Sequence, residues 1–293
     1  MDRVSKDGRP PGHLQSTPAV PASGLASSCT GMGVAPELLA IPFGLVIGLV
    51  VGTVGGGGAI LALPVLVYVL AEGVGSASTA SLIVVAIAAG IGAGALALRG
   101  HVCWRIALTF SAPAAAGSVL GTLANGAVSP QALILGFVPV MLVAAGATWQ
   151  RAGVATGDDL TTCPTAPVGR LLVAGSSVGV LTGFFGVGGG FLIVPVLTLW
   201  LGVCFRRAVA TSLVIITLTG LVALASHLAA GTSIDVSVTA CLAGATAVGA
   251  VSGTMVGQRL PQAVLARAFA VVVASVAAFL LVDTLLLGGP PSA

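Results

Sequence analysis

GTVGGGGAILALPVL, residues 52–66, occurs a second time in altered form as GFFGVGGGFLIVPVL, residues 183–197. The two copies are offset by 131 residues (183 − 52), and twelve of the 31 positions from 52 to 82 are identical in the second copy. In each copy a run of glycines interrupts apolar sequence, and a proline, Pro64 or Pro195, follows six residues after a shared glycine. The chain therefore contains an internal repeat, with one helix break in each half.

The composition places this repeat in a membrane protein. Hydrophobic residues make up 57% of the 293-residue chain and charged residues only 6%, against about 25% charged residues in soluble domains. So few charges cannot cover a water-soluble surface of this size, and lipid must solvate much of it. We predict an all-α integral membrane protein of the plasma membrane. The net charge of +3, without a Lys/Arg run, indicates no nucleic-acid partner.

Ten apolar elements divide into two sets of five. The first set is 38–54, 59–71, 77–98, 106–124 and 131–149, and the second is 171–185, 191–203, 208–229, 236–256 and 268–287. A membrane span needs about 20 residues, so the second and seventh elements are short, which leaves 8–10 transmembrane helices. The predicted parts of the chain are a disordered N-terminal tail 1–34, a first repeat 35–150, a linker 151–169, a second repeat 170–287 and a C-terminal tail 288–293.

The arginines predict how the elements cross the membrane. If all ten elements reverse direction in turn, one side receives every basic residue beyond the tail: Arg99, Arg105, Arg151, Arg170, Arg206, Arg207, Arg259 and Arg267. If 38–71 and 171–203 are single crossings instead, the same arginines divide equally. Because basic loops favour the cytoplasmic side, the ten-element arrangement is preferred. Five elements per half is an odd number, so we predict inverted repeats with both termini outside the cytoplasm.

The glycine breaks are the predicted binding site. Broken backbone at membrane depth is tolerated only where protein or a water-filled cavity satisfies it. The free N–H groups at the start of each short helix, approached closely through glycine, favour an anion. Paired broken segments in two halves of a chain indicate a transporter site. Hydroxyls near the starts of the third and eighth elements could also donate. The predicted site residues are Gly55, Gly56, Gly57, Gly58, Ser81, Gly186, Gly188, Gly189, Gly190, Thr211 and Ser212.

Other residues favour a structural interpretation. Gly117 with Gly121, and Gly249 with Gly253 and Gly257, have the spacing of close helix contacts. His227, near the end of an apolar element, is expected to have a local partner. The five cysteines are widely spaced, without CxxC, and are expected to be free thiols. No acidic residue lies at the centre of an apolar element, so no metal, cofactor or catalytic centre is predicted.

The pattern G-x-x-G-x-G-G-x5-P, present as Gly52 to Pro64 and as Gly183 to Pro195, resembles a known family. Each copy is followed by A-S-L or T-S-L at the start of a helix. The chain resembles the sulfite exporter TauE/SafE family, also called the toluene-sulfonate uptake permease family, over about 37–287. The resemblance implies a carrier of sulfite or another organosulfur anion.

We therefore expect a transporter that moves a small anion across the plasma membrane by alternating access, and not an enzyme. A passive anion channel with the same pore elements is the alternative. An intramembrane enzyme or a structural membrane protein fits the sequence less well. The sequence leaves open the direction of transport, the coupling ion and the oligomeric state.

Overall fold

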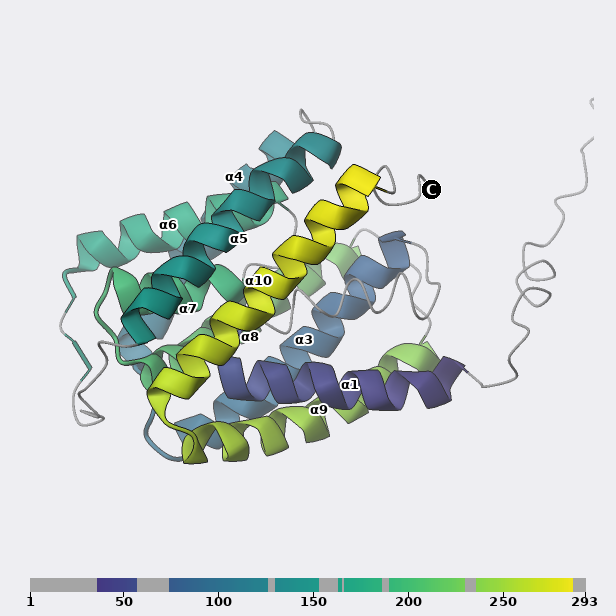
Figure 1. Cartoon of the computed structure of the whole chain (residues 1–293), viewed down its shortest axis with the longest axis horizontal. Helices are drawn as coiled ribbons and strands as arrows, with labels where there is room; N and C mark the ends of the chain where they lie inside the picture. The colour runs from purple at the N-terminus through teal and green to yellow at the C-terminus, as the bar shows by residue number, and fades with distance from the viewer. Residues whose placement is uncertain are drawn as a thin grey trace, which may run out of the picture. The chain divides into compact units, whose positions relative to one another are not determined.

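The computed structural model describes residues 36–56, 74–125, 130–152, 163–164, 166–185, 190–229 and 236–286 (Figure 1). Within these ranges the regular structure is entirely helical. The helices are α1 (Pro36–Val54), α3 (Val74–Ala97), α4 (Trp104–Asn125), α5 (Pro130–Ala152), α6 (Val168–Phe185), α7 (Gly190–Leu199), α8 (Phe205–Ala229), α9 (Val236–Arg259) and α10 (Gln262–Leu286). The predicted element 59–71 and both predicted tails lie outside the described residues.

Six of the described helices are long and apolar enough to cross a membrane. They are α3, α4, α6, α8, α9 and α10. The seventh predicted element is a helix of only 10 residues, α7, about 15 Å long at 1.5 Å per residue. It is too short to cross a hydrocarbon core of about 30 Å. The all-α membrane fold predicted from composition is confirmed.

The helices of the two halves are interleaved. Helix α1 of the first half packs along α9 of the second half, and α6 of the second half packs along α4 of the first. Both pairs lie side by side in Figure 1. Helix α3 packs against α8, and α5 against α10. Corresponding helices of the two halves therefore pack against corresponding partners: α1 with α9 corresponds to α6 with α4.

Glycines make the two longest contacts possible. A Cβ atom at Gly48 would overlap the backbone of Thr246 across the α1–α9 seam, and one at Gly179 would overlap the backbone of Ala114 across the α4–α6 seam. Gly117 and Gly253, which belong to the GxxxG pairs of the sequence, also face backbone of the opposite helix. The predicted role of these glycines in close packing is confirmed. Burial of apolar groups contributes little to helix association in lipid, so such close approach supplies much of the association energy.

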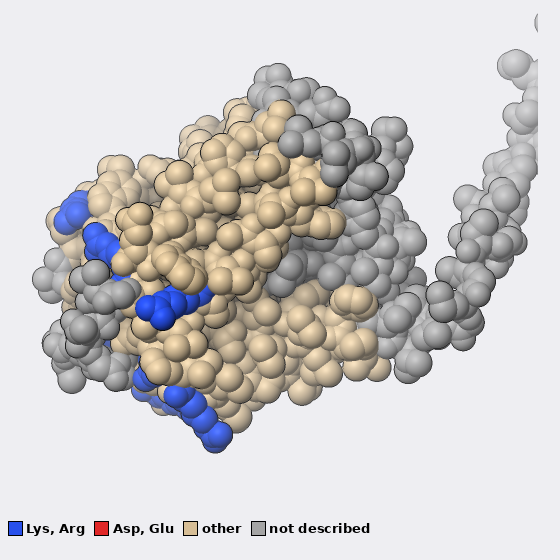
Figure 2. Space-filling view, in the orientation of Figure 1, with Lys and Arg blue, Asp and Glu red and all other residues tan. Residues whose placement is uncertain are grey.

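Apolar side chains remain exposed around the helices. Val143, Leu123 and Val248 are 71%, 75% and 64% exposed, as expected for surfaces that face lipid tails. The arginines gather instead at one end of the helical body (Figure 2). Trp149 is exposed, and the guanidinium of Arg267 lies 5.9 Å from the centre of its ring. Exposed tryptophan beside arginine is typical of a membrane–water interface.

Two of these arginines cap helix ends. Arg170 donates a hydrogen bond from Nη2 to the carbonyl of Trp200 (3.0 Å), just beyond α7, and Arg206 donates from Nη2 to the carbonyl of Leu260 (2.9 Å), just beyond α9. The carboxyl end of a helix carries unpaired carbonyls and partial negative charge, which a guanidinium satisfies. The positive charge at this end therefore holds the loops in place.

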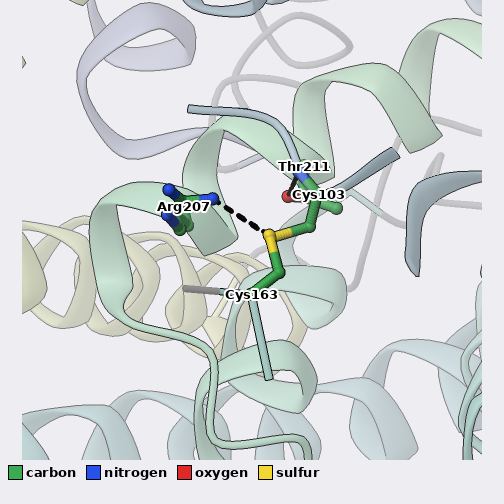
Figure 3. The surroundings of a disulfide bond; sticks show 4 residues. All are labelled: Cys103, Cys163, Arg207 and Thr211. Carbon is green, nitrogen blue, oxygen red and sulfur yellow. Dashed lines mark hydrogen bonds between the residues drawn. A yellow bond between two sulfur atoms is a disulfide. The ribbon is translucent and has the colours of Figure 1, made fainter. Parts of the chain in front are cut away.

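The prediction that all cysteines are free thiols is wrong for two of them. Cys103 and Cys163, which are 60 positions apart in the sequence, form a disulfide with their Cα atoms 6.0 Å apart. Nη1 of Arg207 lies 2.9 Å from Sγ of Cys163 (Figure 3). The bond joins the residue that precedes α4 to the connection between α5 and α6. The chain's return to the same end of the bundle brings the two cysteines together, and local spacing does not show it. Cys204 and Cys241 are free.

Candidate functional site

The first glycine break begins where α1 ends. Gly55 donates its backbone N–H to the carbonyl of Val51 (2.9 Å) and has φ = +84°. This left-handed conformation is the usual glycine cap of a helix and strains any residue that has a Cβ atom. The break is therefore a built termination of α1 inside the protein, where Gly55 and Gly56 are both buried.

The second break ends where α7 begins, and it meets the first. A Cβ atom at Gly190 would lie 2.9 Å from Cα of Gly56 and 2.9 Å from its carbonyl oxygen. A Cβ atom at Gly56 would overlap the backbone of Gly190 in turn. We call this contact of Gly56 with Gly190, together with the adjoining Gly55, the glycine junction. It joins the carboxyl end of α1 to the amino end of α7, whose first N–H groups have no partner within their own helix.

Ser212 on α8 borders the glycine junction. Its Oγ would lie 2.8 Å from a Cβ atom at Gly55, and its side chain is fully buried. The hydroxyl donates to the carbonyl of Val209 (2.8 Å) on the preceding turn. Such a bond within a helix is easily exchanged, because the hydroxyl can rotate toward another acceptor. Ser212 is thus a predicted side chain that lies beside Gly55, at the first break.

Thr211 and Ser81 have other surroundings. Oγ1 of Thr211 accepts the backbone N–H of Cys103 (3.2 Å), next to the disulfide (Figure 3). Ser81 is buried on α3. The part of α3 that faces the start of α8 is Gly92, beside Leu213, and Ser81 lies eleven residues earlier (92 − 81), about 16 Å along the helix. Ser81 is therefore distant from Ser212 along the α3–α8 contact.

The remaining predicted site residues, Gly57, Gly58, Gly186, Gly188 and Gly189, lie outside the described residues. In the ranges that the structure covers, no group of three or more His, Cys, Asp or Glu residues could hold a metal ion. What the described site offers is backbone and hydroxyl polarity in a buried, uncharged junction. Such a junction can bind a ligand through N–H and O–H donors.

Comparisons with known proteins agree with the class that the fold defines, a multi-pass helical membrane protein. The chain matches the family described as sulfite exporter TauE/SafE over residues 40–280. It is 32% identical over 198 residues to a probable membrane transporter protein of Xylella fastidiosa (strain Temecula1), covering 63% of this chain and 71% of the relative. A protein of the same description from strain 9a5c is 32% identical over 194 residues, with the same coverage of 63% and 71%. No solved structure matches.

The chain belongs to the sulfite exporter TauE/SafE family, as the duplicated glycine motif predicted. It is a membrane transporter of that family with several membrane-spanning helices.

Proposed function

We propose that this transporter carries a small anion, sulfite or another organosulfur anion, and binds it at the glycine junction. The observation that supports the proposal is the contact of Gly56 with Gly190, which brings together two breaks that lie in different halves of the chain. A site shared by two repeats is suited to transport, because rocking one repeat against the other exposes it to each side in turn.

The donors at the junction suit an anion. The amino end of α7 presents N–H groups and the positive end of the helix dipole. Ser212 adds a hydroxyl that can turn from the Val209 carbonyl to the ligand. Among the side chains that the structure describes, no carboxylate lies near the junction to repel a negative charge. The family to which the chain belongs is described as sulfite exporters, which supports an oxyanion of sulfur as the substrate.

Counterflow of radiolabelled sulfite in proteoliposomes tests the activity. Unlabelled sulfite inside the vesicles should drive transient accumulation of label, and other organosulfur anions should compete. Flux without counterflow would indicate a channel, and no flux above empty vesicles would contradict sulfite as the substrate.

Ser212→Ala tests the site. We expect uptake to fall about fivefold, because one hydrogen bond is worth about 1 kcal/mol. Ser111→Ala is the matched control: Ser111 is also buried and also donates to its own helix, to Ala107 (2.7 Å), but it lies on α4. Equal uptake by both variants would remove Ser212 from the site.

A further inference from the structure

A small, partly open pocket lies at the arginine end, separate from the glycine junction. Its polar lining comes from Thr53 on α1, His101 before α4, Arg206 on α8, and Thr254 and Gln258 on α9. Four segments that are far apart in the sequence thus direct polar groups into one space. Polar groups that converge in a concave pocket are typical of a ligand site.

Arg206 is the residue that points to the kind of ligand. Its Nη2 is bonded to Leu260, but its Nε is buried and has no hydrogen-bond partner among the described residues. A buried donor on a charged group without a partner is costly. No Asp or Glu side chain occurs in the part of the chain whose side chains the structure describes, so the protein there supplies no counter-charge. An anion in the pocket would offset the charge of Arg206.

We propose that this pocket is a second binding site for a small inorganic oxyanion, held by Arg206 and His101. The inference rests on the proposed function for its class of ligand but places that ligand at a different site. Val209 connects the two sites, because it lines the pocket while its Cα lies 3.5 Å from where a Cβ atom at Gly55 would be. In this proposal the anion occupies the pocket on its way between the arginine end and the glycine junction.

The geometry makes binding depend on pH. Burial, followed by the positive charges of Arg207, Arg206 and Arg99, lowers the pKa of His101 below its usual 6.5. Arg206 and Arg207 lie on α8 and Arg99 lies just beyond α3. The α1, α9 and α10 residues that line the pocket carry no charge. His101 is thus neutral near pH 7 in the empty pocket. A bound anion offsets the arginines and favours the protonated ring, so anion binding takes up a proton and tightens as the pH falls.

Equilibrium binding to the purified protein, without transport, tests this site. Sulfate is the probe, because sulfite itself titrates near neutral pH. Calorimetry at constant ionic strength, in two buffers of different ionisation enthalpy, reports both affinity and proton uptake. We expect wild type to bind sulfate with proton uptake, and His101→Gln to bind with little uptake and little pH dependence. Failure of wild type to bind, or uptake unchanged in His101→Gln, would overturn the proposal.

Arg206→Gln should weaken sulfate binding about tenfold or more, the effect of one charge-assisted hydrogen bond. Arg105→Gln removes the same charge from an exposed position on α4 and should have little effect. If both variants weaken sulfate binding equally, sulfate is attracted by the overall positive charge of the arginine end. That result would contradict a specific site at Arg206.

Arg206 also caps α9, so Arg206→Gln could fail to fold. Two further measurements do not depend on that variant. One is sulfate binding by Arg206→Lys, which keeps the charge, and the other is titration of the His101 imidazole by NMR in wild type. Sulfate should raise the pKa of His101, and an unchanged pKa would overturn the proposal. Absence of sulfite counterflow in wild type with sulfate binding intact would contradict sulfite as the transported substrate and leave this pocket standing.

Discussion

The α1–α9 contact and the α4–α6 contact, here called seams, are packed in the same way but end in different surroundings. In both, glycines let two helix backbones touch. Beyond Gly52 the first seam continues into Thr53 and the polar pocket of Arg206 and His101. Beyond Gly183 the second continues into Phe184 and Phe185, whose ring centres are 5.2 Å apart.

The rings of the second seam extend into a cluster. The ring of Phe137 on α5 lies 5.1 Å from that of Phe185 and 5.3 Å from that of Phe191 on α7. The repeat therefore preserves the backbone contact, which depends on glycine, while the side chains at its end have diverged. The α1–α9 seam has a polar, positively charged pocket at that point, and the α4–α6 seam has aromatic packing.

Alanine at the seams should have the largest effect. Gly48→Ala and Gly179→Ala each force the helices apart, because the added carbon overlaps backbone on the partner helix. We expect each to lower the free energy of unfolding by about 3 kcal/mol, at the upper end for overpacked cores, seen as a loss of monodisperse protein and a lower Tm. Gly94→Ala and Gly146→Ala, where a Cβ atom meets nothing within 4 Å, are the controls. Tolerance of alanine at one seam alone would show that the two seams are not equivalent.

Removal of the disulfide should have a somewhat smaller effect. The bond between Cys103 and Cys163 belongs to the charged end of the bundle, and cross-links of this kind contribute about 2–4 kcal/mol. Thermal unfolding should therefore occur at lower temperature after reduction, or in the Cys103→Ala/Cys163→Ala variant, which should no longer respond to reductant. Cys204→Ala should keep the wild-type response. An identical Tm with and without reductant would contradict this contribution.

The same disulfide also bears on orientation. The positive-inside rule assigns the arginine end to the cytoplasm, where thiols are kept reduced. We therefore expect both cysteines to react with a thiol reagent in freshly lysed cells and to be paired in protein purified in air.

The hydroxyls at matching positions of the two halves should give the smallest effect. Thr254 lines the pocket, and Thr122, at the corresponding place in the first half, is on α4; each donates to a carbonyl of its own helix (2.8 Å). Replacing either by valine should change the free energy of unfolding by less than about 1 kcal/mol. We expect only Thr254→Val to weaken sulfate binding, by a few fold. Equal binding by the two variants would remove Thr254 from the pocket.

Much of the helical architecture follows from the sequence. Apolar runs bounded by arginine, glycine and proline predicted the bounds of α3 to α9 to within about four residues, whereas α10 begins six residues before its predicted start (268 − 262). The GxxxG spacing predicted close helix packing at Gly117 and Gly253 but not which helices pair. The glycine runs predicted a break, since several adjacent glycines oppose a helix. These features depend on neighbours in the chain, so local composition is sufficient to find them.

Contacts between distant segments were decided by the tertiary structure. Gly56 meets Gly190 because helices of the two halves are interleaved. Cys103 meets Cys163 because the chain returns to the same end of the bundle after α5. Arg206, interpreted from the sequence as a topology signal, lines a pocket only because the ends of α1 and α9 lie beside the start of α8. Thr211 and Ser212, adjacent in sequence, have different partners because successive residues of a helix point about 100° apart, a consequence of 3.6 residues per turn. The sequence alone determined that this chain is a helical membrane protein with two broken repeats, and the packing of those repeats determined which polar groups meet.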